Sequence, residues 1–450
     1  MMRRHFALGR SFYLLWMGES LAVIGTALME FALGIWVYSQ TGSALSFAGV
    51  VLAATLPAVL FLPLAGGLAD RISHKTIIVF SDALLAILLF GVMGLLWFDR
   101  LETLHLYIFN CLASIVSAFR KPAYQAAVNS LLAADKFTRA SGLIGASKSA
   151  SALVAPLLAG VIMAKAGLVT VLAIDLLTFC SGTLLVIKAF SQVKLAASHS
   201  GSAAESVLAG ALRNIGNALG FFKAERLMFG LLVYAMLRNA LLSMATLMMT
   251  PLLLSTHSSQ TLGLAYTWAA LGGLSGAGLL MVMGNPRRLM LMAVCADLLL
   301  ALGVIALGLV SATTAYCALA FILITTASVA DGGVNALWMR KIPKGSRASV
   351  FALISMLTIA ASSLAIFAGG LVVDHWFQPA LEPGGRYAES IGAWLGVGKG
   401  RGVGLLFVVS GAILGALCLG TLFYRPMRRL DSLVRDEAEA PSTNLAEALS

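Results

Sequence analysis

Charged residues are scarce in this sequence. Only 11% of its 450 residues are Asp, Glu, Lys or Arg, whereas 59% are hydrophobic and the mean hydropathy is +0.92. Soluble globular proteins carry about 25% charged residues. The composition therefore excludes an ordinary soluble protein and predicts a polytopic membrane protein.

Cysteine is also sparse, and several catalytic patterns are missing. All five cysteines fall inside apolar runs, where a thiol behaves as a small apolar side chain, so no disulfide framework and no metal site are predicted. The sequence contains no G-x-x-x-x-G-K-[ST] phosphate loop, no nucleophile elbow and no zinc-ligand spacing. We therefore expect neither an enzyme nor direct coupling to ATP, and we expect no cofactor.

What the sequence has in abundance is long apolar runs. A helix that crosses a bilayer needs about 20 mostly apolar residues, because the backbone must satisfy its own hydrogen bonds there. The predicted spans are 12–37, 45–69, 76–98, 104–129, 141–164, 168–189, 226–253, 260–284, 288–310, 314–339, 348–373 and 402–424. The basic residues 1–5 resemble the flank of a signal peptide, but no Ala-x-Ala-like site ends the run that follows. The sequence thus predicts an all-α membrane protein of 12 transmembrane helices, with the first run retained.

The distribution of basic residues over the loops predicts how the chain is oriented in the membrane. The formal net charge of +11 could suggest a nucleic-acid partner, but the Lys and Arg residues are spread over alternate loops instead of forming one patch. Loops rich in Lys and Arg stay on the cytoplasmic side of a membrane. We therefore expect both termini in the cytoplasm, a location in the cell inner membrane or plasma membrane, contact with lipids, and no nucleic-acid partner.

Short patterns recur between the two halves of the chain. The recurrences are Asp82–Ala86 with Asp297–Ala301, Val128-Asn129 with Val334-Asn335, and Arg139–Ser141 with Arg347–Ser349. Each lies in the corresponding predicted span, or at its start, on the same side of the membrane. The pattern predicts two parallel six-helix halves. The predicted divisions are 1–190 for the first half, 191–225 for a cytoplasmic linker, 226–424 for the second half and 425–450 for a disordered cytoplasmic tail.

Two connecting segments have distinct compositions. Within the linker, residues 214–223 predict an amphipathic helix lying on the cytoplasmic face. The external segment 374–401 is rich in glycine and aromatic residues, and it could be either a lid or an insertion.

The loop between the second and third spans carries a recognisable motif. It has two small residues at a helix end, then an acid, then bases: Gly66-Gly67-Leu68-Ala69-Asp70-Arg71-Ile72-Ser73-His74-Lys75. This resembles the G-x-L-a-D-R-x-G-R-K signature of the major facilitator superfamily, with Ser73 and His74 in place of the usual Gly and Arg. The resemblance implies two halves that enclose a site near the bilayer midplane. It also implies that Gly66, Asp70, Arg71 and Lys75 act as a gate that latches the outward-facing state.

Other positions resemble the drug-efflux branch of that family, which includes bacterial macrolide efflux permeases. The matching segments are Trp16–Glu19, Thr41–Ala44, Ala118–Ala123 and Ala173–Asp175. The antiporter motif of the fifth span is represented by Ala155, Pro156 and Gly160, whose small side chains favour close helix packing. The arginine often embedded in the fourth span of antiporters is Ala113 here, with Arg120 and Lys121 closer to the cytoplasmic end.

Few ionisable residues lie inside the predicted spans, and such residues usually face a cavity. Glu19 and Glu30 are eleven residues apart, which places them within about 20° on one helix face and about 16 Å apart along its axis. Both can line one cavity and bind a proton, a cation or substrate. Hydrogen bonding to neighbouring helices is the alternative role.

The remaining candidates are fewer and more ambiguous. Arg238 should pair with Glu19, with Glu30 or with an anionic substrate group, or else form a structural ion pair. Lys148 either faces the site or extends to the cytoplasmic surface, and Asn239 could line the cavity. Asp82 and Asp297 are expected to make the same structural hydrogen bonds in both halves, and Asp331 to pair with loop bases.

Together these features predict a secondary transporter that exports amphipathic, drug-like or natural-product small molecules by alternating access and proton antiport, and the family resemblance implies a monomer. A siderophore exporter and a lysophospholipid flippase share much of the pattern. The alternative from another class is a transporter-like sensor or a membrane protein that does not transport.

Overall fold

The computed structural model describes residues 8–69, 73–132, 136–191, 207–284, 286, 288–343, 346–428 and 430–433, and these residues are almost entirely helical. The long helices are α2 (Arg10–Thr41), α3 (Ala44–Ala69), α4 (His74–Trp97), α5 (Thr103–Leu131), α6 (Phe137–Ser191), α7 (Val207–Ala224), α8 (Arg226–Thr256), α9 (Ser259–Met283), α10 (Leu289–Leu309), α11 (Thr313–Lys341), α12 (Arg347–Val372) and α15 (Arg401–Phe423). Short elements are the π-helical turn η2 (Val373–Phe377), α13 (Gln378–Ala380), α14 (Gly392–Leu395), α16 (Arg425–Arg428) and α17 (Leu430–Leu433).

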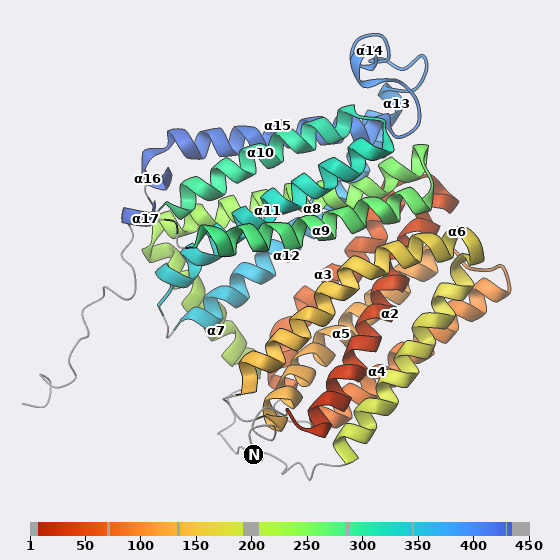
Figure 1. Ribbon diagram of the computed structural model, residues 1–450, viewed down its shortest axis with the longest axis vertical. Coiled ribbons are helices and arrows are strands. Elements are labelled where there is room, and N and C mark those ends of the chain that lie inside the picture. Colours follow the sequence, from red (N-terminus) through yellow and green to blue (C-terminus); the bar gives the residue numbers. More distant parts are fainter. Residues whose placement is uncertain are drawn as a thin grey trace, which may run out of the picture.

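The helices form two bundles. Helices α2 to α6 make one bundle and α8 to α12 with α15 make the other, while α7 connects them (Figure 1). In Figure 1 the bundles meet near the turn within α6 and diverge toward the end where α7 lies.

Helix α6 contains two of the predicted spans. Its 55 residues run through Gly167, where φ is 72° and ψ is −177°. That positive φ suits glycine, because a side chain would clash with the backbone there. The chain reverses at this residue and needs no separate loop between the fifth and sixth spans.

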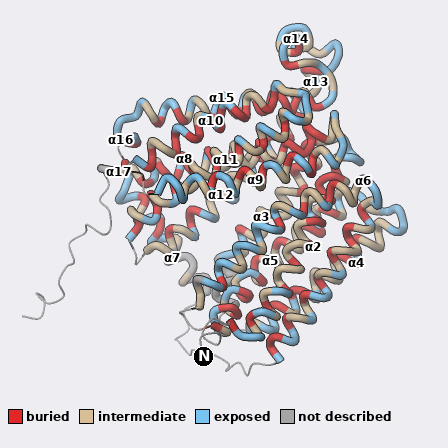
Figure 2. Tube along the Cα trace, viewed as in Figure 1, coloured by how far each residue is buried: buried red, intermediate tan, exposed pale blue. Residues whose placement is uncertain are grey.

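The outer surfaces of the helices are apolar. Ten helices in the described part of the chain are long and apolar enough to cross a membrane, counting α6 once. On α4, Phe80, Ile87 and Phe90 are 59–69% exposed (Figure 2 shows this outer face). Large apolar side chains exposed over whole helices fit hydrocarbon better than water. The protein is therefore a multi-pass membrane protein, as predicted from its composition.

Small residues bring the two bundles together at one end. A side chain at Gly160 of α6 would collide with the Ser259 carbonyl of α9, and one at Gly263 of α9 would collide with the Pro156 carbonyl of α6. The Ser259 hydroxyl also donates to the Gly160 carbonyl at 3.2 Å. Because glycine lets two backbones approach this closely, the predicted small-residue motif of the fifth span lies at the crossing of the two bundles.

One acid also joins the bundles at this end. Asp374, in η2 of the second bundle, accepts from the Ser43 hydroxyl at 2.5 Å and from the backbone N–H groups of Ala44 and Leu45 at 3.1 and 3.0 Å. These N–H groups open α3 of the first bundle and have no partner within the helix. Asp374 thus caps a helix of the opposite bundle, where a negative charge is also favoured by the helix dipole.

The connecting segments differ in part from the sequence-based expectations. Helix α7 forms within the predicted linker, with Ala218 and Phe222 buried in the core of the second bundle. The segment 374–401 folds on itself, because Gln378 bonds the carbonyl of Gly398 and the N–H of Gly402. In Figure 1 it projects beyond the bundles and does not cover them.

The prediction that the tail is disordered from residue 425 is wrong for residues 425–428 and 430–433. Helices α16 and α17 form there, Leu430 is fully buried, and Asp431 accepts from the N–H groups of Leu289 and Met290 at 3.1 and 3.2 Å. A tail acid therefore caps α10, a contact that the acidic composition alone did not reveal. Residues 434–450 lie outside the described part.

We predict that Asp374→Ala weakens the contact between the bundles by about 1–2 kcal/mol, the usual cost of losing a helix cap. The population with separated bundles at this end should rise by a factor of roughly 5–30. The measurement is the distance between spin labels at Gln40→Cys and Gln260→Cys, which are exposed near this end, in a background with the five native cysteines replaced by alanine.

The control is Glu382→Gln, an exposed acid of the same segment, 374–401, whose side chain forms no hydrogen bond or ion pair with a described residue. It should leave the distance distribution unchanged. An Asp374→Ala distribution identical to that of the control would show that the cap does not hold the bundles together.

Candidate functional site

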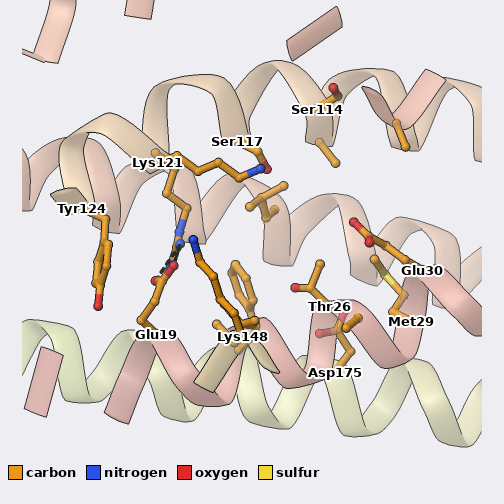
Figure 3. A pocket seen from close by; sticks show the side chains of 18 of the residues that line it. Glu19, Thr26, Met29, Glu30, Ser114, Ser117, Lys121, Tyr124, Lys148 and Asp175 are labelled. Atoms are coloured by element: carbon orange, nitrogen blue, oxygen red, sulfur yellow. Dashed lines mark hydrogen bonds and ion pairs between the residues drawn. The ribbon is translucent and has the colours of Figure 1, made fainter. Parts of the chain in front are cut away.

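A cavity of about 500 Å³ lies inside the first bundle. Its walls come from α2, α3, α4, α5 and α6, and no described residue of the second bundle lines it. Its ionisable lining residues are Glu19, Glu30, Arg120, Lys121, Lys148 and Asp175, with Tyr124 at one end (Figure 3). Hydroxyl and amide groups such as Thr26, Asn110 and Ser114 lie between them. The cavity is therefore large enough for a small molecule and carries charges of both signs.

Glu19 is held in an ion cluster at one end of this cavity. The Arg120 guanidinium lies 2.8 Å from Oε2 of Glu19 through NH1 and 2.6 Å from Oδ1 of Asp82 through Nε. The other Asp82 oxygen accepts from the Thr183 hydroxyl at 3.0 Å. Asp82 is only 2% exposed, so it depends on Arg120 for its counter-charge. The cluster joins α2, α4, α5 and α6.

The second bundle contains a matching cluster. Nε of Arg238 lies 2.8 Å from Oδ1 of Asp297, and the other Asp297 oxygen accepts from the Tyr234 hydroxyl at 2.6 Å. Arg238 also pairs with Asp331 and donates to the Ala327 carbonyl. Arg238 and Asp297 are 1% and 0% exposed.

This cluster corrects two expectations. Arg238 pairs with the acids of its own bundle instead of Glu19 or Glu30, because Asp297 and Asp331 reach it from the adjacent helices α10 and α11. Among the described residues, Asp331 pairs with Arg238 of the same bundle. Arg238 therefore forms an ion pair within its own bundle, the structural alternative considered for it, and it does not line the cavity.

The two clusters confirm the predicted repeat of hydrogen bonding at Asp82 and Asp297. Each aspartate binds an arginine Nε through one oxygen and a hydroxyl through the other. The arginine comes from the fourth span in the first bundle and from the first span in the second. Both halves thus neutralise a buried aspartate with an arginine, but the arginine lies on a different helix in each half.

Glu30 and Asp175 face the cavity at the other end. Asp175 is 3% exposed, and its Oδ1 has no hydrogen-bond partner among the described residues. It packs against Gly25 of α2, where a side chain would lie 2.7 Å from that oxygen. The Glu30 carboxylate forms no hydrogen bond or ion pair with the described residues, and its charge and that of Asp175 repel each other. Two acids from neighbouring helices therefore share one region of the cavity (Figure 3).

Two lysines also extend into the cavity. Lys121 comes from α5 and Lys148 from α6, and both side chains point inward in Figure 3. Both residues are exposed to the cavity, and neither forms an ion pair within the described structure. For Lys148 the structure thus supplies the cavity-facing position that the sequence left open.

The other predicted site residues lie elsewhere. Asn239 donates to the Ala235 carbonyl of its own helix at 2.9 Å and does not line the cavity. Ala155 is buried in the first bundle beside the helix crossing at Pro156 and Gly160. Gly66 lies near the end of α3 and Lys75 is exposed at the start of α4. Asp70 and Arg71 lie outside the described residues, so the gating loop stays a prediction.

Sequence reasoning missed Arg120, Lys121 and Asp175 as members of the site. Arg120 and Lys121 were placed near the cytoplasmic helix end, although they lie on the helix that carries Asn110, Ser114 and Ser117. Those residues follow a spacing of three and four, which marks one polar face of α5. This polar face is the sequence pattern from which the cavity wall could have been predicted.

The fold and the cavity together define a class of protein. Two membrane-embedded helix bundles, whose contacts include small residues and a carboxylate cap at one end, have the architecture of a secondary transporter. The comparison with known families agrees with that class.

The chain belongs to the Major Facilitator Superfamily, whose family model matches residues 15–366. Its members are transporters and not enzymes. Among curated proteins it is similar to Macrolide efflux protein A of Streptococcus pyogenes, with 24% identity over 376 residues that cover 81% of this chain and 91% of the relative.

Solved structures show the same fold. The nucleoside transporter NupG matches with a TM-score of 0.66 and 14% identity, covering 92% of this chain and 100% of that one. A bacterial homologue of the human lysosomal transporter Spinster, inward-facing and occupied, matches with a TM-score of 0.67 and 15% identity, covering 94% and 96%. At this level of identity the likeness establishes the fold alone.

We predict that Arg120→Leu destabilises the protein by about 3–5 kcal/mol, since it leaves Asp82 buried without a counter-charge. The measurement is the midpoint of thermal unfolding in detergent. The Arg120→Leu/Asp82→Asn double variant should recover part of the loss, because it removes both charges of the pair.

Lys121→Leu is the matched control, since it removes the adjacent base, which has no ion-pair partner in the described structure. Its unfolding midpoint should equal or exceed that of the wild type. Equal midpoints for Arg120→Leu and Lys121→Leu would contradict a stabilising role for the Glu19–Arg120–Asp82 cluster.

Proposed function

We propose that this transporter exports amphipathic, drug-like small molecules in exchange for protons, and that Glu30 and Asp175 carry the proton. The observation that supports the proposal best is the placement of these two acids. They face one cavity inside a membrane protein, and neither forms an ion pair with a base among the described residues, although the charge of Lys121 acts on Glu30. Two neighbouring carboxylates hold one shared proton more readily than two separate negative charges.

Glu19 has a different role in this mechanism. Its carboxylate is already neutralised by Arg120, which Asp82 and Glu19 share. A carboxylate paired in this way is a poor proton carrier while the pair persists. Glu19 therefore acts in positioning Arg120 at the cavity wall, and proton exchange falls to Glu30 and Asp175.

Alternating access would come from movement of one bundle against the other. The bundles are joined by Asp374, by the crossing of α6 and α9, and by the packing of α3 on α12, all of which can break without disturbing either bundle. At the opposite end the Gly66–Lys75 loop would latch the other state, as its resemblance to the family motif implies. With the termini in the cytoplasm, the present arrangement faces inward.

The direction and the class of substrate rest on similarity. Macrolide efflux protein A, by its name, exports macrolides, and it shares 24% identity with this chain over most of both lengths. The cavity volume of about 500 Å³ lies within the range of pockets that hold drug-sized ligands. These two observations favour efflux of a bulky organic molecule over transport of an ion alone.

We predict that Glu30→Gln and Asp175→Asn each abolish transport driven by a pH gradient, because an amide cannot take up or release the proton. The measurement is accumulation of fluorescent and antibiotic compounds in inverted membrane vesicles under an imposed pH gradient. Membrane expression and elution as a single species on size-exclusion chromatography should match the wild type.

Glu382→Gln, on the external segment, serves as the control and should transport normally. Glu19→Gln tests the division of roles. It should lower the unfolding midpoint, and transport should keep its dependence on the gradient. Normal gradient-driven accumulation in both Glu30→Gln and Asp175→Asn would refute the proposed proton site.

A further inference from the structure

The charges that line the cavity are separated into two regions. Lys121 and Lys148 lie near the level of Glu19 and Ser20 on α2, since Arg120 beside Lys121 binds Glu19 and Ser147 beside Lys148 bonds Ser20 at 2.8 Å. We call this pair of lysines the basic end, although the Lys121 amine extends to the level of Ser117 in Figure 3 and its charge also acts on Glu30.

The acidic end consists of Glu30 and Asp175. Asp175 packs at the level of Gly25 on α2. Five to ten residues of helix separate Ser20 from Gly25 and Glu30, which corresponds to about 8–15 Å along the axis. Ser114, Ser117 and Thr26 provide hydroxyl groups between the two ends (Figure 3).

Among the described residues, the acids near the basic end, Glu19 and Asp82, both pair with Arg120. Glu19 of the cavity wall pairs with Arg120, whose Nη1 donates to Oε1 at 3.1 Å and lies 2.8 Å from Oε2, a buried oxygen with no hydrogen-bond partner among the described residues. Asp82 is bound to Arg120 and Thr183 and is not part of the lining. Arg120, Lys121 and Lys148 thus bring three positive charges to the two negative charges of Glu19 and Asp82, and the two exposed lysine ammonium groups, which form no ion pair with a described residue, are open to water.

A ligand that fills the cavity must displace this water. Two ammonium groups enclosed inside a membrane protein without a counter-charge are strongly unfavourable. An anionic ligand group removes that penalty and gains charge-assisted hydrogen bonds. A ligand carrying only a positive charge would place it in a cavity where these two charges already repel it.

We propose that the cavity binds an amphipathic zwitterion, with a carboxylate or phosphate between Lys121 and Lys148 and an amine beside Glu30 and Asp175. The inference rests on the proposed function for the choice of this cavity as the substrate site, and it adds the substrate class. In this arrangement the ligand amine and the proton compete for the same two carboxylates. That competition couples release of one to binding of the other.

The test is equilibrium binding to the purified full-length protein in lipid nanodiscs, measured by calorimetry at fixed pH and without a gradient. The probes are norfloxacin, which carries a carboxylate and an amine at opposite ends, and norfloxacin methyl ester, which lacks the carboxylate charge. The wild type should bind the acid at least about tenfold more tightly than the ester, the value of one charged hydrogen bond.

The Lys121→Met/Lys148→Met double variant keeps the apolar stems and removes both charges. It should bind the acid and the ester with equal affinity. The matched control is Lys165→Ala/Lys188→Ala, which removes two exposed lysines of α6 that do not line the cavity. This control should keep the wild-type preference for the acid.

A second arm distinguishes a drug-like ligand from a lipid headgroup. It uses lysophosphatidylethanolamine, which carries a phosphate and an amine. Lysine-dependent binding of this lipid alone would support the proposal with a lysophospholipid as ligand, and lysine-dependent binding of norfloxacin alone would support it with a drug-like carboxylate. Lysine-independent binding of both probes, or no binding of either, would overturn it.

The outcome is separable from that of the proton-coupling test. Binding is measured without a gradient, so it does not depend on proton exchange. Lysine-dependent binding together with normal gradient-driven transport in Glu30→Gln and Asp175→Asn would retain the substrate class and reject the proton site. Loss of transport in those two variants, together with lysine-independent binding, would retain the proton site and reject the substrate class.

Discussion

The structure depends on the buried pairing of one arginine with aspartate in each bundle. A charge inside a membrane protein is tolerated only when an opposite charge and hydrogen bonds compensate it. Arg120 with Asp82 and Arg238 with Asp297 meet that condition by joining several helices at one point. The same pairing divides the acids into two groups. Glu19 is bound to Arg120, while Glu30 and Asp175 stay available to bind a proton or a ligand amine.

The contact between the bundles is built differently from the bundles themselves. Inside each bundle, buried ion pairs and large apolar clusters make separation costly. Between them lie glycine crossings at Gly160 and Gly263, the carboxylate cap at Asp374, and the packing of α3 on α12, where Thr55 and Ser363 share a hydrogen bond of 2.7 Å. Backbone contacts and a helix cap of this kind are worth little and can be remade with water. Rigid bundles with a weak joint are what alternating access requires.

Much of the fold could be predicted from the sequence. Composition and run length indicated the multi-pass membrane class, and the recurring patterns at Asp82 and Asp297 led to the expectation of two related halves. Helix α5 shows the limit of such reasoning: its span was predicted, but the polar residues along one of its faces were not recognised as the wall of a cavity. The tail contact of Asp431 on α10 joins segments 142 positions apart, which local patterns cannot reveal.

The sequence by itself determined which residues carry charge inside the membrane, since hydrophobic runs make every ionisable exception visible. It placed Glu19 and Glu30 on one face of a helix, and both line the same cavity. Only the tertiary structure decided how these charges are paired. Arg120 lies on a different helix from its partner Glu19, and Arg238 lies on a different helix from its partner Asp297. Electrostatic pairing depends on distances between helices, and helix periodicity contains no information about those distances.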